Sequence, residues 1–212
     1  MAKEGLLAVV SGFSGAGKGT IMKKLLKTHD GYALSISATT RKPRSEDKDG
    51  VTYFFKTKEE FESMIEKGEL YEYASYQGNY YGTPKAYVDE QRQAGKDVLL
   101  EIEVQGAAKI KEKFPETILV FVTPPSAEIL RDRLVGRGTE TEEEIRGRLA
   151  RAAEEAALMD RYDYILVNDD LDRAVEELDA YLHSDHKNKD NKEIIEKINR
   201  ELAAYVKGDT QL

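Results

Sequence analysis

The sequence contains no cysteine. This absence excludes disulfide bonds, thiolate catalysis and zinc or iron–sulfur centres that depend on cysteine ligands. Histidine is scarce as well: His29 stands alone, and His183 and His186 flank Asp185 in a polar stretch that offers no further metal ligand. We interpret this pair as solvated rather than metal-binding.

Long hydrophobic runs are also missing. A membrane-spanning helix needs about 18 or more consecutive apolar residues, and no such run occurs in the chain. The first apolar segment, Leu6 to Val10, is too short for the core of a signal peptide and no cleavage pattern follows it. We therefore expect a cytoplasmic protein that has no membrane partner.

The charge balance is acidic. The 212 residues include 32 lysines and arginines against 40 aspartates and glutamates, which gives a net charge of −8. Such a balance argues against a general nucleic-acid-binding surface, although it permits local basic pockets that hold small phosphates. The length fits one compact domain with small inserted parts, and the sequence predicts no particular oligomeric state.

Short apolar runs alternate with helix-like stretches along most of the chain, and this alternation predicts an α/β fold with a parallel sheet flanked by helices. The runs are typical of buried strands; they cover residues 6–10, 98–102, 118–122 and 165–167. The helix-like stretches lie at 106–113, 126–135 and 141–158, and a further helix is expected after Lys18, up to Asp30.

Three segments depart from this alternation. Short strands, one of them Val51 to Phe55, and a tyrosine-rich stretch predict an inserted subdomain, while a Gly136-Arg137-Gly138 break between arginine-rich and glutamate-rich helices predicts a hinged lid. A polar linker then leads to an amphipathic terminal helix that packs on the core or on a partner. We predict a core at about 1–34, 97–125 and 159–183, the inserted subdomain at about 35–96, the lid at about 126–158 and the C-terminal linker and helix at about 184–212.

A glycine-rich motif follows the first apolar run. Residues 12–18 match G-x-x-x-x-G-K, and they lie between a predicted strand and a predicted helix, the context in which such a loop holds phosphates. Its backbone N–H groups surround phosphate oxygens, and the ammonium group of Lys18 stabilises the β- and γ-phosphates. The alternative is a glycine turn that only joins strand to helix. The predicted phosphate-binding residues are Gly12, Phe13, Ser14, Gly15, Ala16, Gly17, Lys18, Gly19 and Thr20.

A second candidate phosphate site is the segment Ser37 to Arg44. It places Arg41 and Arg44 three residues apart beside several hydroxyls. Arginine binds phosphate oxygens through two parallel hydrogen bonds, and tyrosine hydroxyls can add further donors. Considered by charge alone, a solvated basic loop is the more ordinary interpretation.

Six motifs occur in an order that resembles the guanylate kinases, over residues 5 to about 183: SGFSGAGKGT, SATTRKPR, GNYYGTP, EIEVQG, GRGTETEEEIRGRL and VNDD. The resemblance implies a core domain with the phosphate loop, a GMP-binding domain inserted after the second strand, and a lid that carries arginines. It also implies ATP and GMP as substrates, with Mg²⁺ accompanying ATP. The implied reaction converts GMP, and also dGMP, to the diphosphate in purine nucleotide metabolism.

The resemblance also assigns residues to the acceptor site. Those implied for the GMP phosphate are Arg41, Arg44, Tyr53 and Tyr81, and those implied for the guanine base are Ser37, Glu72, Thr83 and Glu103. The chemistry agrees, because the N1–H and 2-amino group of guanine can both donate to one carboxylate, here Glu72, while O6 accepts a hydroxyl proton, here that of Thr83. Glu103 stands where the family usually has aspartate. Without the flanking motifs, an exposed carboxylate would be the preferred interpretation of Glu72.

On the donor side, the resemblance implies that Arg133, Arg137 and Arg148 neutralise the transferring phosphoryl group together with Lys18. Salt bridges within the acidic segment 140–144 are the alternative for these arginines. Asn168 resembles an adenine-side contact, against the alternative of a strand-end turn. Gly19 stands where phosphate loops have a metal-binding hydroxyl, so Thr20 and Glu101 are the candidates for holding Mg²⁺, directly or through water.

Two rival functions stay open on the sequence. One is a kinase for another monophosphate, such as AMP or dTMP, which shares the phosphate loop. The other is a non-catalytic module of the same fold that has lost its phosphate-binding residues. The intact lysine and arginines favour the enzyme.

Overall fold

We describe a computed structural model of the chain, which places residues 3–136, 141–185 and 191–207. The chain divides into two compact units. The first comprises Met1–Ala8 and His29–Thr117, and the second comprises Val9–Thr28 and Ile118–Leu212. The predicted inserted subdomain falls within the first unit and the predicted lid within the second, while the predicted core is divided between them. The predicted three-part division therefore stays a prediction.

The first unit contains two parallel strands, two flanking helices and a separate sheet. Strand β2 (Tyr32–Leu34) pairs with β7 (Asp97–Glu101), with Ala33 opposite Val98. Helix α3 (Lys85–Gln93) packs on β7, and α4 (Val104–Lys113) packs on β5 (Leu70–Tyr76) of the separate sheet. Val98, Leu99 and Leu100 are fully buried, as a strand covered on both faces requires.

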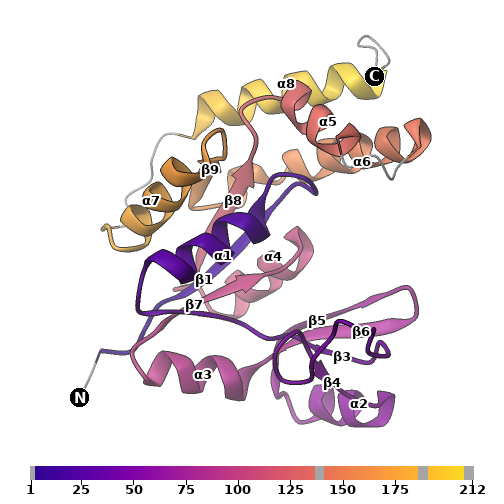
Figure 1. Cartoon of the computed structure of the whole chain (residues 1–212). Coiled ribbons are helices and arrows are strands. Elements are labelled where there is room, and N and C mark those ends of the chain that lie inside the picture. Colours follow the sequence, from indigo (N-terminus) through magenta and orange to yellow (C-terminus); the bar gives the residue numbers. More distant parts are fainter. Residues whose placement is uncertain (1–2, 137–140, 186–190, 208–212) are drawn as a thin grey trace. The chain divides into compact units, whose positions relative to one another are not determined.

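The separate sheet of this unit has the strand order β4-β3-β6-β5. Its strands are β3 (Ala38–Thr39), β4 (Phe54–Phe55), β5 (Leu70–Tyr76) and β6 (Asn79–Pro84). Helix α2 (Lys58–Glu66), drawn beside this sheet in Figure 1, starts at a capping box formed by Thr57 and Glu60. The side chain of each of these two residues accepts a hydrogen bond from the backbone N–H of the other, so two N–H groups that lack a partner within the helix are paired. Phe61 of α2 packs with Ala38 and Leu70 in the core of this sheet.

The second unit holds the phosphate loop between β1 (Leu7–Gly12) and α1 (Lys18–Thr28). Strand β8 (Ile118–Thr123) pairs in parallel with β9 (Tyr164–Val167), and α7 (Leu171–Leu182) packs on β9 and α1. Within the second unit the strands of the parallel sheet follow the order β1-β8-β9, although the first residues of β1, up to Ala8, belong to the first unit. Every residue of β8 is buried, which explains its unbroken apolar pattern.

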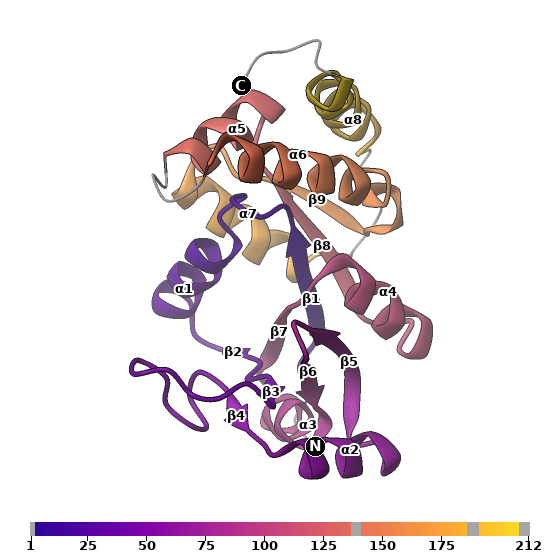
Figure 2. The same cartoon turned by 90° about the vertical axis from the view of Figure 1, so that its right-hand side faces the viewer.

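Three further helices and one short turn complete the second unit. They are α5 (Ala127–Val135), α6 (Glu142–Ala156), the 3₁₀ turn η1 (Met159–Arg161) and α8 (Lys192–Lys207). Helix α8 lies along α6 and also contacts α5 and η1 (Figures 1 and 2). The terminal helix therefore packs mainly on α5 and α6, which belong to the predicted lid and not to the predicted core.

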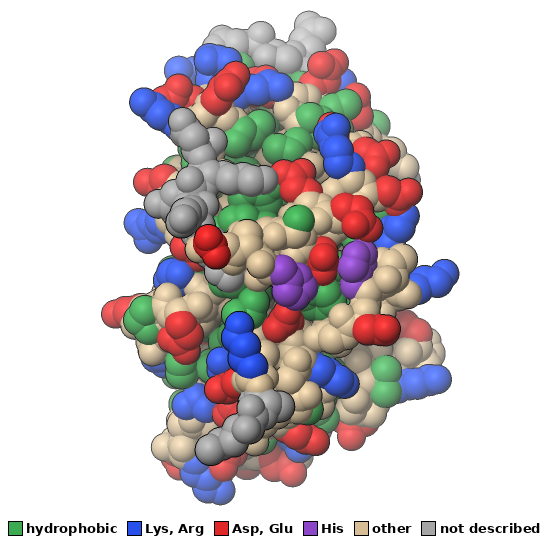
Figure 3. Space-filling model, turned by 90° about the vertical axis from the view of Figure 1, so that its left-hand side faces the viewer, with side chains coloured by type: hydrophobic (Ala, Val, Ile, Leu, Met, Phe, Trp, Pro, Cys, Tyr) green, Lys and Arg blue, Asp and Glu red, His purple; other side chains and the backbone are tan. Residues whose placement is uncertain are grey.

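The predicted α/β class is confirmed, with a parallel sheet flanked by helices. The expected strand 51–55 is wrong in extent, because residues 50–52 form a turn, Tyr53 makes an isolated bridge with Asp49, and the strand itself is Phe54–Phe55. None of the helices in the described part of the chain is both long and apolar enough to cross a bilayer. On the face drawn in Figure 3, acidic and basic side chains of the described residues are interspersed.

Candidate active site

The phosphate loop has the backbone that its glycines predict. Gly12 and Gly17 have φ values of 143° and 95°, in the region that L side chains rarely adopt. A Cβ atom would lie 2.1 Å from the Val122 carbonyl oxygen at Gly12, and 2.3 Å from Nδ2 of Asn168 at Gly17. Neither position accepts a side chain, so the glycines here are required both by conformation and by space.

Two of the variable positions of the loop belong to the hydrophobic core. Phe13 and Ala16 have no exposed surface, and the Phe13 ring packs edge-on against Phe121 with 4.9 Å between centroids. The loop is therefore anchored on β8 through an aromatic pair, a contact favoured by edge-to-face geometry. Ser14, between these anchors, is exposed.

The Lys18 ammonium group bends back over the loop. Its Nζ donates to the carbonyl oxygens of Gly12 at 2.7 Å and Phe13 at 3.0 Å. Lys18 is the first residue of α1, so its charge lies at the helix N-terminus, where anions also bind. The residue predicted to stabilise phosphate charge is thus held against the loop that would surround the phosphates.

The side chains of Arg133 and Asn168 both contact the loop at the carbonyl oxygen of Ala16. Asn168 Nδ2 donates to that oxygen at 2.7 Å, and Arg133 Nη1 donates to it at 3.2 Å. Arg133 Nη2 also donates to the Asn168 carbonyl at 2.7 Å. Asn168 is only 7% exposed, and its amide is engaged with the loop. Burial lowers the pKa of Arg133, and Asp169 opposes this effect.

Arg148 on α6 also reaches the loop, where its Nη1 donates to Ser14 Oγ at 2.8 Å. Within the acidic segment, Arg146 pairs with Glu142 at 2.9 Å. The Thr141 N–H is the first cause that holds the pKa of Glu144 below its usual range, and the charge of Arg148 contributes too. Two of the three predicted lid arginines, Arg133 and Arg148, therefore contact the loop in the second unit. The third, Arg137, lies outside the described residues.

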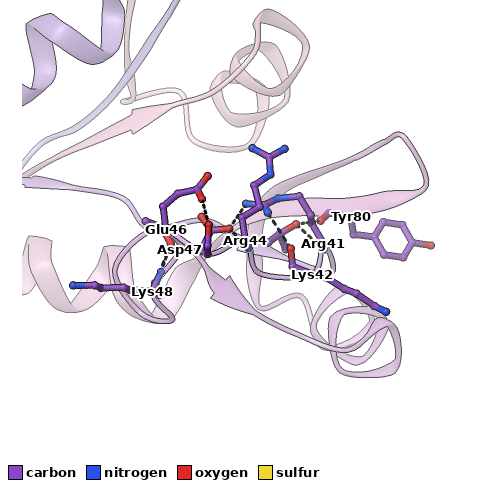
Figure 4. A network of polar contacts seen from close by, with 10 residues as sticks. Arg41, Lys42, Arg44, Glu46, Asp47, Lys48 and Tyr80 are labelled. Atoms are coloured by element: carbon purple, nitrogen blue, oxygen red, sulfur yellow. Dashed lines mark hydrogen bonds and ion pairs between the residues drawn. The ribbon is translucent and has the colours of Figure 1, made fainter.

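The predicted acceptor loop is organised around Asp47, as Figure 4 shows. Its Oδ2 accepts from the backbone N–H of Arg44 at 2.8 Å and pairs with Arg41 Nη2 at 2.9 Å. The Arg44 N–H is the first cause that holds the pKa of Asp47 below its usual range, and Arg41 contributes too. The Arg44 guanidinium is exposed and makes no ion pair with any residue that the structure describes.

Two tyrosines complete the cluster around Arg41. The guanidinium carbon lies 5.3 Å from the centroid of the Tyr53 ring, and the Tyr53 and Tyr81 rings are 6.2 Å apart. Arginine over an aromatic face is a favourable cation–π arrangement. The structure therefore brings together three of the four residues predicted to bind an acceptor phosphate, from a loop, a turn and a strand of the first unit.

Glu72 on β5 and Thr83 on β6 form a buried pair. The Thr83 hydroxyl donates to Glu72 Oε1 at 2.9 Å, and Glu72 is 8% exposed. Burial raises the pKa of Glu72, while the Thr83 hydrogen bond and the charge of Lys109 act in the opposite direction. A hydroxyl has one proton, so in this arrangement Thr83 supports the carboxylate; donation to guanine O6 needs that hydroxyl to turn.

Gly106 in α4 faces the other oxygen of this carboxylate. A Cβ atom at Gly106 would lie 3.2 Å from Glu72 Oε2. This distance is tighter than most packed side chains tolerate. The glycine at the end of the EIEVQG motif thus leaves space for the Glu72 side chain.

Ser37, Glu101 and Glu103 occupy less defined places. Ser37 is partly exposed just before β3, and its carbonyl accepts from the Phe54 N–H at 2.9 Å. Strand β7 ends at Glu101, and Glu103 is the N-cap residue of α4. Glu103 is nevertheless near enough to Glu72 for its charge to raise the Glu72 pKa.

A metal ion accompanying ATP would find few protein ligands. The described residues include no group of three or more histidine, aspartate or glutamate side chains arranged to hold a metal. Thr20 is exposed in the first turn of α1, close to the loop in sequence, and Glu101 is exposed in the first unit. Mg²⁺ commonly keeps several waters and binds through nucleotide phosphates, so this sparse donor set fits it.

Three contributors to the site were not predicted from the sequence. Asp47 orders the acceptor loop, and Gly106 and Lys109 on α4 surround the Glu72 carboxylate. The bond from the Arg44 N–H to Asp47 joins residues only three positions apart, within one local segment of the sequence. Contacts between α4 and β5 have no comparable local signal, since 34 positions separate Gly106 from Glu72.

Comparisons with known proteins identify the family of the chain. The guanylate kinase family model matches residues 5–185. Guanylate kinase of Clostridioides difficile is 55% identical over 203 residues, which cover 94% of this chain and 98% of that protein. Guanylate kinase of Shouchella clausii is 54% identical, covering 87% of this chain and 90% of that protein. The crystal structure of guanylate kinase from Anaplasma phagocytophilum superposes with a TM-score of 0.64 at 31% identity, covering 91% and 93% of the two chains. This chain belongs to the guanylate kinase family.

Proposed function

We propose that this protein is an ATP-dependent guanylate kinase, which transfers the γ-phosphoryl group of ATP to GMP and yields ADP and GDP. The observation that carries this proposal is the buried Glu72–Thr83 pair, held in the same unit as the cluster of Arg41, Tyr53 and Tyr81. The Glu72–Thr83 pair suits the hydrogen-bond donors of guanine, and the cluster around Arg41 suits a phosphate monoester. Membership of the guanylate kinase family supports the same reaction.

Base selection would depend on an ionised Glu72. The carboxylate accepts from N1–H and from the 2-amino group of guanine, and adenine offers neither donor. An adenine base would leave this buried carboxylate unpaired, a mismatch that gives discrimination of roughly 10⁴ or more in sites of this kind. Thr83 and Lys109 favour the ionised form that recognition needs. Glu103 and Ser37 are the further base contacts in this proposal.

The phosphate of GMP would bind at Arg41, Arg44, Tyr53 and Tyr81. Arg44 is exposed at the acceptor loop, and Arg41 is oriented by Asp47. Two guanidinium groups and two phenol hydroxyls suit the three oxygens of a phosphate monoester. Neutralising this phosphate also lowers the charge repulsion that its oxygen meets when it attacks ATP.

The transfer would be an in-line displacement at the γ-phosphorus of ATP. A GMP phosphate oxygen forms the new bond, the bond to the β–γ bridging oxygen breaks, and ADP leaves with its electron pair. The nucleophile is already anionic, so no strong general base is needed. Lys18, Arg133, Arg137 and Arg148 would neutralise charge on the donor, and residues 12–20 and Asn168 would hold ATP.

Mg²⁺ would accompany ATP, with Thr20 and Glu101 as its candidate protein contacts, directly or through water. When bound, the ion neutralises phosphate charge. We further propose that residues 126–158 act as a lid and residues 35–96 as the GMP-binding subdomain of a core formed by 1–34, 97–125 and 159–183. Use of dGMP, a cytoplasmic location and a role in purine nucleotide recycling belong to the same proposal.

A coupled assay of ADP release across GMP, dGMP, AMP, CMP, UMP and dTMP, with Mg·ATP, tests the proposal. We expect turnover with GMP, and also with dGMP, far above that with AMP. Turnover that favours AMP or dTMP would assign a different monophosphate kinase. Binding of GMP and ATP without any ADP release would instead assign a non-catalytic module.

A further inference from the structure

The middle of helix α8 binds both ends of the helix pair that carries the donor-site arginines. We call this pair, residues 127–135 and 142–156, the α5–α6 arm. Arg133 lies on its first helix and Arg148 on its second. Three polar side chains of α8, within residues 197–201, contact the backbone at the two ends of the arm.

The first end is held by a charged pair. Glu201 Oε2 accepts from the backbone N–H of Ala127, the first residue of α5, at 2.9 Å. Lys197 Nζ donates to the Pro125 carbonyl at 2.8 Å and lies 4.0 Å from Glu201, one turn along α8. The first N–H groups of a helix have no partner within the helix, and a carboxylate there is favoured by the helix dipole.

The other end is held by an amide. Asn199 Nδ2 donates to the carbonyl of Ala156, the last residue of α6, at 3.2 Å, and to the Ile195 carbonyl of its own helix at 3.0 Å. The last carbonyls of a helix lack partners within the helix. The bond to Ile195 holds the Asn199 amide in one orientation on α8. The bond to Ala156 therefore fixes the end of the arm relative to α8.

An apolar seam backs these polar contacts. Ile198 is 1% exposed and Leu202 is fully buried, and α8 packs on α6. Burial of two such side chains attaches α8 firmly to the second unit. Apolar packing alone leaves the position of a helix along its neighbour loosely specified, whereas directed hydrogen bonds at both ends specify it.

We propose that Glu201 and Asn199 are positioning residues for phosphoryl transfer. By fixing the first and last residues of the α5–α6 arm, they set the positions of Arg133 and Arg148 against the phosphate loop, where these arginines contact Ala16 and Ser14. This inference rests on the proposed function. It gives the terminal helix a role in catalysis in addition to its packing.

The experiment compares Glu201→Ala and Asn199→Ala with Glu196→Ala, which removes a carboxylate that pairs with Lys192 within the same helix. We expect the first two variants to lower kcat/KM for ATP by about tenfold to a hundredfold, because misplacement of catalytic groups by about 1 Å has effects of this size. The KM for GMP stays unchanged, since its proposed contacts lie in the other unit. Glu201→Gln keeps an acceptor oxygen and restores most of the activity, and Glu196→Ala behaves as the parent.

Double-mutant cycles separate positioning from mere stability. If Glu201 acts through Arg133 and Asn199 through Arg148, the effect of each α8 substitution shrinks strongly when its arginine is already alanine. Thermal unfolding measured in parallel ensures that every variant is folded at the assay temperature. Equal losses in both backgrounds, or folded variants with parent-like kcat/KM for ATP, would overturn the proposal.

Calorimetric binding of a non-hydrolysable ATP analogue keeps the two proposals distinguishable. An inactive parent with GMP contradicts the proposed function alone. The positioning role then still requires that Glu201→Ala and Asn199→Ala weaken analogue binding relative to Glu196→Ala. Unchanged binding in that case contradicts the positioning role as well.

Discussion

Thr83 donates its only hydroxyl proton to Glu72, at 2.9 Å, inside the first unit of the chain. The carboxylate is 8% exposed, and its burial raises its pKa. A group that is costly to bury in its ionised form is retained here, and the guanine recognition that we propose needs that form. Stability and function therefore place opposite demands on Glu72.

Glu72→Gln is expected to stabilise the protein while it impairs GMP selection. The pKa of Glu72 is raised on folding, so the native state binds more protons than the unfolded state between the normal and the raised pKa, and stability falls as pH rises through that window. Glutamine removes this loss. Relief of about 1 kcal/mol would raise Tm by about 2–4 °C for a chain of this size. The gain should be present at pH 8 and absent at pH 4.

The same Glu72→Gln variant should lower the ratio of kcat/KM for GMP over AMP by about two powers of ten or more, since glutamine offers one acceptor oxygen where guanine presents two donors. The acceptor panel measures this ratio. An unchanged ratio would remove Glu72 from base recognition even if the stability change is found.

Lys18→Ala should reduce kcat by about three powers of ten or more, because preorganised charge at the transferring phosphoryl group acts mainly in the transition state. Lys23→Ala, at an exposed position of the same helix, is the matched control and should keep parent activity. Circular dichroism checks that both variants are folded. Near-normal kcat in Lys18→Ala contradicts its assigned role.

Gly106→Ala and Gly147→Ala are a matched pair of helical substitutions with different expected outcomes. The new methyl group at Gly106 meets Glu72 Oε2 at 3.2 Å, whereas a Cβ atom at Gly147 meets nothing within 4 Å. We expect Gly106→Ala to raise the KM for GMP several-fold with the KM for ATP unchanged. Gly147→Ala should instead stabilise the protein by about 0.5–1 kcal/mol, because alanine favours the helix. Steady-state kinetics and urea unfolding measure the two effects, and equal kinetics for both variants would refute the assignment of Gly106.

Asp47→Ala should weaken GMP binding through Arg41. The carboxylate pairs with Arg41 and accepts from the Arg44 N–H, so its removal leaves the acceptor loop less ordered. We expect a higher KM for GMP and an unchanged KM for ATP. Glu46→Ala, next to it on the exposed side of the loop, is the control. A parent-like KM for GMP would show that Asp47 has no part in holding Arg41 for its ligand.

The sequence predicts the fold where one local pattern dominates. The apolar runs that became β1, β7, β8 and β9 are buried on both faces, so their pattern is continuous and needs no tertiary information. Strand β2 and helices α3 and α7 were not predicted individually. Strand β2 has three residues, too few for a periodic signal, and its pairing with β7 is decided by a partner 65 positions away.

The site was predicted to a similar degree. The residues that we propose for phosphate binding could be selected from the sequence, because the glycines and the lysine occur at the spacing typical of phosphate-binding loops. The contacts between Arg148 and Ser14, 134 positions apart, and between Asn168 and Ala16, 152 positions apart, depend on how helices and strands pack. Local patterns contain no information about such pairs. The same limit applies to Glu201 and Asn199, which on the sequence are simply polar positions of a terminal helix.

Phe13 imposes a packing requirement on the phosphate loop. The motif G-x-x-x-x-G-K allows any residue at this position, yet the Phe13 ring is fully buried against Phe121. A loop transplanted from another nucleotide-binding protein, with a small or polar residue there, would open a void in the core and lose about 3–5 kcal/mol of stability, as truncation of buried phenylalanines does. Sequence drift in this loop is therefore restrained by folding as well as by phosphate binding, and loop grafts in this scaffold need a side chain of matching volume at residue 13.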